Sequence, residues 1–82
     1  MNLYLVEQYE NNDYDTFDAI IVAAKSKTEA QYTNPKTGDI IENWEIVKRY
    51  WCSSPNSAQV TYLGKAALGI KQQIILASYR KG

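Results

Sequence analysis

The pattern of apolar and polar positions predicts short strands separated by polar turns. Residues 3–9 are rich in Leu, Val and Tyr and predict a first strand, and the polar run 10–13 predicts a turn. Residues 15–25 predict a second strand with an apolar centre at 20–22. Because apolar residues there point to both faces, we expect this strand to be covered on both faces over part of its length. The two strands form a predicted hairpin.

A short helix is predicted directly after the hairpin. Residues 26–29 read Ser-Lys-Thr-Glu, which fits a capping box in which the Ser26 oxygen accepts a backbone N–H one turn ahead. The run Asn-Pro-Lys-Thr-Gly at 34–38 is a strong turn signal and ends the helix. Its apolar face is small, so we expect the helix to cover the sheet.

The second half of the chain predicts two or three further strands. Residues 40–47 predict a third strand. It either begins at Ile40 and Ile41 and continues through the later apolar residues Trp44, Ile46 and Val47, or is formed by those later residues alone. Residues 58–63 alternate as a half-buried strand does, and residues 73–79 predict the final strand. Between them, residues 65–68 predict one helical turn closed by Gly69.

The elements together predict a single α+β domain over residues 1–82. We expect a small, mostly antiparallel sheet of four to five strands in the order β-β-α-β-β-β, with one short helix packed on it. A chain of this length buries only about 60% of its unfolded surface. Apolar residues at 45% and charged residues at 22% are ordinary for a globular protein.

Composition also indicates where the protein acts. The longest apolar run, 19–24, is far shorter than the ~18 residues of a membrane span, and the first residues resemble a strand more than a signal peptide. A lone Cys52 cannot form an internal disulfide. We therefore expect a soluble cytosolic protein that does not contact a membrane.

Charge is divided unevenly along the chain. All nine acids lie in residues 1–45 beside three lysines, which gives this half a net charge of −6. Residues 46–82 carry six cations and no acid, which gives +6. Such asymmetry marks a face for a charged partner in some proteins. In others, acidic strands simply pair beside basic ones and the surface is mixed.

The residue inventory argues against an enzyme. The chain has no histidine, which removes Ser–His and Cys–His nucleophile pairs and histidine ligands for zinc. Cys52 is expected to be a small, partly buried apolar residue. The acidic turn at 11–15 partly matches a calcium loop, but Thr16 stands at its glycine and Val22 at its glutamate. We expect a non-enzymatic protein without a metal or cofactor.

Aromatic residues are the strongest sign of binding. Seven tyrosines, two tryptophans and one phenylalanine are more than so small a core can hide, and interfaces are enriched in Tyr and Trp. Trp44, Tyr50 and Trp51 are expected to be exposed next to two cations, which suits an acidic protein surface or a stacked base with its phosphate. The candidate binding residues are Tyr14, Asp15, Trp44, Lys48, Arg49, Tyr50, Trp51 and Arg80.

Several stretches of the chain resemble a family of small proteins encoded by phages and prophages, to which no activity is assigned. They are Tyr-Asp-Thr-Phe-Asp at 14–18, Ile-Val-Ala-Ala at 21–24, Asn-Pro at 34–35, Val-Thr-Tyr-Leu-Gly-Lys-Ala at 60–66 and Ile-Leu-Ala-Ser-Tyr at 75–79. The resemblance covers most of the chain and is weakest over 39–58. Relatives often have His where this chain has Asn34, and a small residue where it has Lys81.

The resemblance implies a phage product in the cytoplasm of a bacterial host, where small phage proteins commonly antagonise defence. Our first hypothesis is a non-enzymatic inhibitor that docks on a host defence protein. The second is a homo-oligomer that sequesters a small anionic signalling nucleotide, with Lys48, Arg49, Arg80 and a tryptophan where subunits meet. The third is a nucleic-acid-binding protein that uses the basic residues of 46–82.

Overall fold

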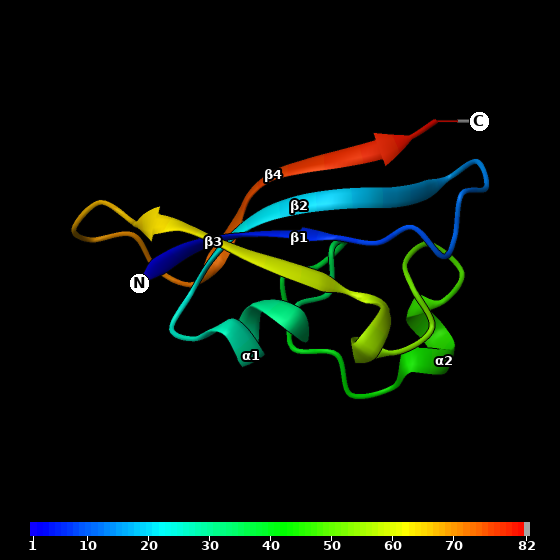
Figure 1. The fold of residues 1–82 in the computed structure, drawn as a ribbon, viewed down its shortest axis with the longest axis horizontal. Helices are drawn as coiled ribbons and strands as arrows, with labels where there is room; N and C mark the ends of the chain where they lie inside the picture. The colour runs from blue at the N-terminus through cyan, green and yellow to red at the C-terminus, as the bar shows by residue number, and fades with distance from the viewer. Residues whose placement is uncertain (82) are drawn as a thin grey trace.

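The computed structural model describes residues 1–81, which form a four-stranded antiparallel sheet in the order β3-β1-β2-β4 (Figure 1). The strands are β1 (Asn2–Glu7), β2 (Thr16–Ala24), β3 (Gln59–Lys65) and β4 (Gln73–Arg80). The expected α+β class and antiparallel sheet are confirmed. The central hairpin of β1 and β2 comes from the first third of the chain, and the two later strands pair on its outer edges.

Two short α-helices and a 3-10 turn cover one face of the sheet (Figure 1). The helix α1 (Lys27–Gln31) begins where its cap predicts, because the Ser26 hydroxyl oxygen accepts the Glu29 N–H at 3.2 Å. The second helix, α2 (Trp44–Val47), is followed along the chain by the turn η1 (Pro55–Ser57). The sheet is therefore one layer, and residues 26–58 form a second.

The predicted third strand is wrong. Ile40 forms only an isolated bridge to Thr33, and residues 44–47 are helical. The Asn43 side-chain oxygen accepts the Glu45 N–H at 3.0 Å, which is the bond of a helix N-cap. This local cap overrides the strand propensity of the apolar residues behind it.

The predicted helical turn at 65–68 is also wrong. The strand β3 continues to Lys65, and the chain then bends in an isolated turn in which the Ile70 N–H donates to the Ala67 carbonyl at 3.2 Å. Gly69 does lie in this turn with a φ of 88°, a conformation that glycine adopts without strain. Gly69 therefore allows the turn that connects β3 to β4, and it does not end a helix.

The core lies between the sheet and the helix layer. Val6, Ile20 and Val22 project from the two central strands and are fully or almost fully buried. They meet Val47 and Trp51 from the segment around α2. Trp51 is the largest side chain with no exposed surface, so it fills more of this core than any other fully buried side chain.

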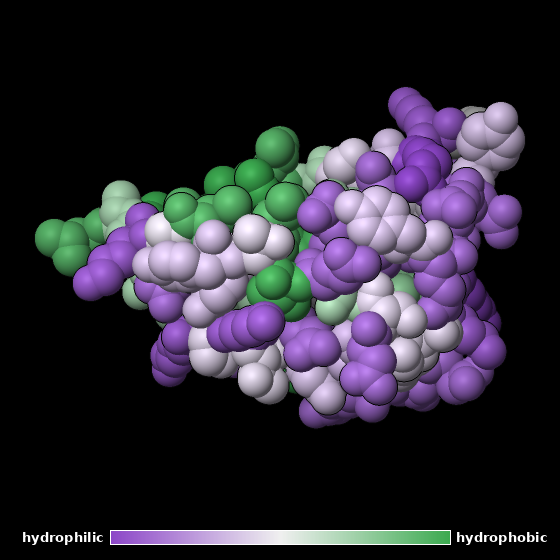
Figure 2. All heavy atoms as spheres, in the orientation of Figure 1, coloured by the Kyte–Doolittle hydropathy of each residue, from purple (hydrophilic) through white to green (hydrophobic). Residues whose placement is uncertain are grey.

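The opposite face of the sheet is only partly covered. Ala23 and Ala24 face opposite sides at the end of β2 and are both fully buried, so the expectation of two covered faces holds there. Farther along, Ile75 of β4 is 47% exposed and Leu76 is 63% exposed. Figure 2 shows apolar side chains gathered along this upper side, over the start of β4 and the loop before it.

The sheet order mixes the two charged halves of the chain. The strands β1 and β2 belong to the acidic half, and each pairs with a strand of the basic half. Across the β2–β4 pair, the Arg80 guanidinium lies 3.9 Å from the Asp18 carboxylate. The two strands of the acidic half therefore lie at the centre of the sheet, and each has a strand of the basic half on its outer side.

Within residues 1–81, no helix has the length and apolar character needed to cross a membrane.

Candidate functional site

Two adjoining hollows form a groove on the helix-side face of β4. The first has a volume of about 320 Å³ and is lined by Asp15, Phe17, Lys36, Arg49, Tyr50 and Tyr79. The second has a volume of about 530 Å³ and shares Phe17 and Lys36 with the first. We call them the aromatic compartment and the amide compartment. Both volumes fall in the range of small-molecule sites.

Three rings form the wall of the aromatic compartment. The Phe17 ring centroid lies 4.7 Å from that of Tyr79 and 6.1 Å from that of Tyr50, both in inclined arrangements. The register of β2 and β4 places Tyr79 directly opposite Phe17. Cross-strand aromatic pairs of this kind stabilise a sheet, and their free faces offer a stacking surface.

Tyr50 is held in place from two sides. Its carbonyl accepts the Phe17 N–H at 2.8 Å, and its hydroxyl accepts the Asn34 side-chain amide at 3.0 Å. The Lys36 ammonium lies 5.4 Å from its ring centroid, within cation–π range. The ring is thus oriented before any ligand arrives.

The turn at 34–39 carries Lys36 into the groove. The Asn34 side-chain oxygen accepts the Lys36 N–H at 2.9 Å, and the Asn34 carbonyl accepts the Gly38 N–H at 2.8 Å. Gly38 has a φ of 82°, which a residue with a side chain rarely adopts. Asn34 therefore holds this turn together through both its side chain and its carbonyl.

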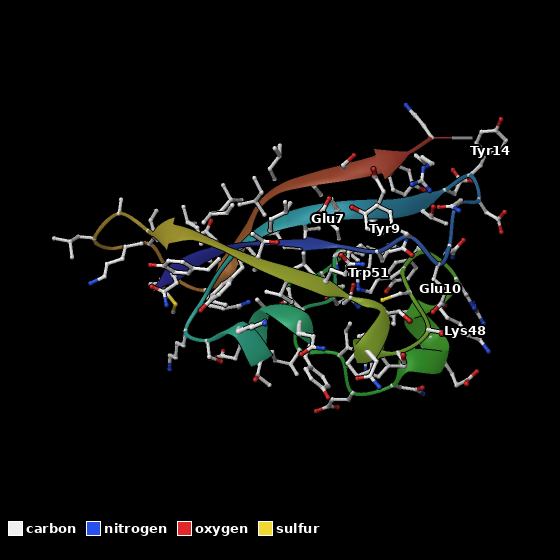
Figure 3. All side chains as sticks on the ribbon, in the orientation of Figure 1. Glu7, Tyr9, Glu10, Tyr14, Lys48 and Trp51 are labelled. Carbon is white, nitrogen blue, oxygen red and sulfur yellow. The ribbon has the colours of Figure 1, made fainter. Side chains whose placement is uncertain are left out.

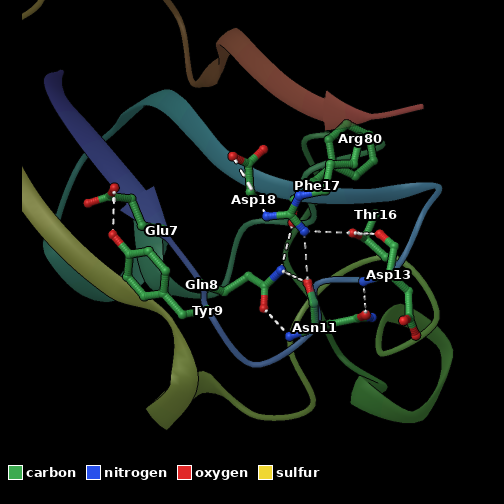
Figure 4. A network of polar contacts seen from close by, with 9 residues as sticks. All are labelled: Glu7, Gln8, Tyr9, Asn11, Asp13, Thr16, Phe17, Asp18 and Arg80. Carbon is green, nitrogen blue, oxygen red and sulfur yellow. Dashed lines mark hydrogen bonds and ion pairs between the residues drawn. The ribbon is translucent and has the colours of Figure 1, made fainter. Parts of the chain in front are cut away.

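A polar network around Gln8 and Asn11 joins β1, the loop after it and β2 (Figure 4), and Asn11 extends it to the segment that follows α2. The Gln8 side-chain amide is fully buried and donates to the carbonyls of Asn11 and Phe17, both at 2.8 Å. The Asn11 amide in turn donates to the carbonyl of Lys48 at 3.0 Å and of Trp51 at 3.3 Å. The hairpin loop thereby fixes the chain on both sides of the residues that enter the groove.

Asp15 stands at the rim of the aromatic compartment with a φ of 62°. Asp is one of the few residues with a side chain that tolerates this left-handed conformation. Its N–H donates to the Arg80 carbonyl at 2.6 Å, and its carboxylate accepts the Tyr79 hydroxyl at 3.3 Å. Partial burial and the Asp15 charge raise the pKa of the Tyr79 hydroxyl above its ordinary value.

The two cations of the groove are exposed and face a ring-lined surface. Among residues 1–81, ion pairs join Lys48 to Glu45 and Arg80 to Asp18, and neither Lys36 nor Arg49 takes part in one. Their charges are therefore available to an anion.

The structure brings three of the eight predicted binding residues together. Asp15, Arg49 and Tyr50 line the aromatic compartment. Arg80 lies behind it, where its guanidinium donates to the Asn11 carbonyl at 3.3 Å and the Thr16 hydroxyl at 3.4 Å. Arg80 therefore acts within the polar network.

The remaining four predicted residues lie elsewhere. The expectation that Trp51 is exposed is wrong, because its ring fills the core between the sheet and the helix layer (Figure 3). Trp44 is half-buried and packs edge-to-face on Tyr32 at 5.9 Å. Lys48 pairs with a glutamate on its own helix, and Tyr14 is 78% exposed at the tip of the hairpin loop.

Three lining residues were not predicted from the sequence: Phe17, Lys36 and Tyr79. Phe17 and Tyr79 lie in the predicted strands 15–25 and 73–79, and Lys36 lies in the predicted turn at 34–38. No pattern local to these segments shows that they meet, because the pairing of β2 with β4 brings Phe17 and Tyr79 to one place.

Residues suited to covalent or metal chemistry do not gather at the groove. Burial raises the pKa of the Cys52 thiol to about 11, and its sulfur donates to the Ser54 carbonyl at 3.4 Å. Within the described part of the chain, no three His, Cys, Asp or Glu side chains come together as a metal site needs. What the aromatic compartment offers is three rings and two cations.

Comparison of the chain with family models, with curated proteins and with solved structures gives no match.

Proposed function

We propose that this protein is a non-enzymatic binding protein whose groove holds a small anionic ligand with a planar ring, as a nucleotide has. The observation that carries the proposal is the position of Lys36 and Arg49 beside the rings of Phe17, Tyr50 and Tyr79. Stacking on aromatic rings is worth about 1–3 kcal/mol per base, and a phosphate gains charge-assisted hydrogen bonds from the cations.

The two halves of such a ligand each meet a matching group. A nucleotide places a flat ring and a phosphate within a few ångströms of each other. The aromatic compartment supplies rings for the first and two cations for the second.

Calorimetric titration with nucleoside monophosphates and dinucleotides tests the proposal. Lys36→Ala and Arg49→Ala should each weaken binding about tenfold or more, because each removes a charge-assisted hydrogen bond worth about 1.5–3 kcal/mol. Lys65→Ala is the matched control, since it removes an exposed lysine at the end of β3, outside the groove. Absence of binding at millimolar ligand, or equal affinity in all three variants, contradicts the proposal.

The non-enzymatic part has its own test. The ligand is incubated with the protein, released by denaturation and chromatographed. We expect it to be recovered unchanged, because no histidine is present and the single thiol is buried. Recovery of a cleaved or transferred product that scales with protein concentration would show an enzyme.

The resemblance to phage-encoded proteins supports a biological role for such binding. In a bacterial host, a phage protein that holds a signalling nucleotide withdraws it from the defence pathway that uses it. Expression in bacteria with a nucleotide-signalling defence should restore phage plating, and expression of the Lys36→Ala protein should not. Equal restoration of phage plating by both proteins would show that antagonism of the defence does not depend on the groove.

A second candidate function is docking on a host protein, and the uncovered strand β4 favours it. Residues 73–79 carry no charge, Leu76 is 63% exposed, and within residues 1–81 the outer edge of this strand forms no backbone hydrogen bonds. Such an edge is a template for another strand. Lys71 precedes this uncharged stretch, and Arg80 and Lys81 come directly after it, so the complementary partner is an extended host segment with acidic residues on both sides of an apolar centre.

The same charges disfavour a second copy of this chain. An antiparallel pairing of two β4 strands centred on Leu76 would set Lys71 of one copy opposite Lys81 of the other. The test measures hydrogen exchange of the protein with a synthetic peptide of apolar centre and Asp/Glu ends. We expect slower exchange in β4, lost in Leu76→Glu and kept in Leu68→Glu, a change in the exposed loop. A dimer dispersed by Leu76→Glu would assign the strand to a second copy and contradict docking.

A further inference from the structure

The position of Lys36 suggests a ligand with two halves. Lys36 and Phe17 line both compartments, so these residues lie where the two meet. The Lys36 backbone is fixed by the Asn34 side chain, and its ammonium lies 5.4 Å from the Tyr50 ring centroid. A lysine near the middle of a groove is suited to an anion near the middle of its ligand.

The amide compartment has the surfaces that a second base needs. Its lining is mixed, with apolar groups from Pro35, Ile74 and Ala77. The polar lining residues are Thr37, Asp39, Gln72 and Gln73, which carry donors and acceptors. Gln72 donates from its amide nitrogen to the Gly38 carbonyl at 3.3 Å, which orients the amide. A lining that combines apolar and polar groups is compatible with the flat faces and polar edges of a base.

We propose that the groove binds a dinucleotide, with one base in each compartment and the connecting phosphate at Lys36. This inference rests on the proposed function. The compartments, of about 320 and 530 Å³, are each within the range of a small-molecule site. A mononucleotide that stacks on the rings leaves the amide compartment to water. A dinucleotide fills both compartments, and its connecting phosphate binds Lys36, which the two compartments share.

The second base should increase the affinity at least about tenfold. This factor corresponds to the lower part of the free energy that one stacked base contributes to binding. The linear dinucleotides pApA and pGpG and the corresponding cyclic dinucleotides are titrated against AMP and GMP by calorimetry. We expect one of the dinucleotides to bind at least about tenfold more tightly than the mononucleotide of the same base.

Two variants locate the second base. Ala77 is exposed and lines the amide compartment but not the aromatic one, so Ala77→Leu fills that compartment alone. Ser78→Leu adds a leucine to the next position of β4, on the opposite face of the sheet beside Leu5 and Leu76. Ala77→Leu should reduce dinucleotide affinity to that of the mononucleotide and leave mononucleotide affinity unchanged. Ser78→Leu should change neither, and thermal melting confirms that both variants fold.

The outcomes separate the two proposals. Equal affinity for mono- and dinucleotides overturns the dinucleotide inference and leaves the nucleotide site standing. Tighter dinucleotide binding that Ala77→Leu does not affect also overturns it, because the second base then lies outside the amide compartment. Absence of binding by every probe removes the proposed function together with the inference.

Discussion

The chemistry of the single thiol is decided by its burial. Cys52 has no exposed surface, its sulfur donates to the Ser54 carbonyl, and burial raises its pKa to about 11. A thiol reacts as its thiolate, so the native protein at pH 8 carries almost no reactive form.

We therefore expect Cys52 to resist alkylation by iodoacetamide at pH 8 until the protein unfolds. The measurement is mass spectrometry of the native protein over time, with the protein in denaturant as the control. Native labelling as fast as that of the denatured protein would contradict the buried position of Cys52.

At the same scale, residue type and neighbours placed Asp15, Arg49 and Tyr50 among the candidates, and these three line one hollow in the structure, whereas the expected exposure of Trp51 was wrong. A tryptophan beside cations has the same sequence signature on a surface and in a core. Only the position of the chain after α2, beneath the sheet, buries this ring.

At the scale of elements, the link between the β1–β2 loop and the segment around η1 depends on one carboxylate. Glu10 accepts from the Ser57 hydroxyl at 2.6 Å and from the Ser53 N–H at 3.0 Å. These hydrogen bonds lower the pKa of Glu10 below its ordinary value of about 4.5. The stabilisation is therefore complete above that value and is lost as the pH falls through the folded pKa.

We expect Glu10→Gln to lower the thermal midpoint at pH 7, and the difference from the wild type to shrink as the pH is taken from 5 to 3. Calorimetric or fluorescence melting across this range measures it. Glu42→Gln, at an exposed glutamate, is the control. A difference between wild type and Glu10→Gln that stays constant with pH would contradict the assigned hydrogen bonds.

Elements whose signals are local were predicted well. The cap at Ser26 and the alternation in the strands lie within a few residues, so α1 and the four strands were expected close to their observed places. The helix α2 was missed because apolar residues at 44–47 are compatible with a strand, and the side chain of Asn43 decides the outcome. Short apolar runs carry this ambiguity in general.

At the scale of the whole molecule, Gln8 joins the sheet to the helix layer. Its buried amide makes three hydrogen bonds to the backbone of Asn11 and Phe17. The Asn11 side chain in turn donates to the Lys48 carbonyl, in the segment after α2. The sequence gives no sign of this role, because a lone glutamine after a strand is ordinarily exposed.

We expect Gln8→Ala to reduce the free energy of unfolding by about 2–3 kcal/mol, because it leaves buried backbone groups without partners. Urea denaturation measures the change. Gln59→Ala, at an exposed glutamine of β3, should stay within about 0.5 kcal/mol of the wild type. Equal stability of the two variants would show that the network does not hold the layers together.

The sequence by itself determined the α+β class, the hairpin, the helix start and the residue types that argue against an enzyme, because these depend on composition and on neighbours along the chain. The tertiary structure alone decided the groove. Phe17, Lys36 and Tyr79 come from three distant segments, and only the antiparallel pairing of β2 with β4 and the braced turn at 34–39 bring them together. It also decided the charge pattern, since pairing places each basic strand beside an acidic one. Contacts between distant segments depend on packing and strand order, which local sequence patterns do not encode.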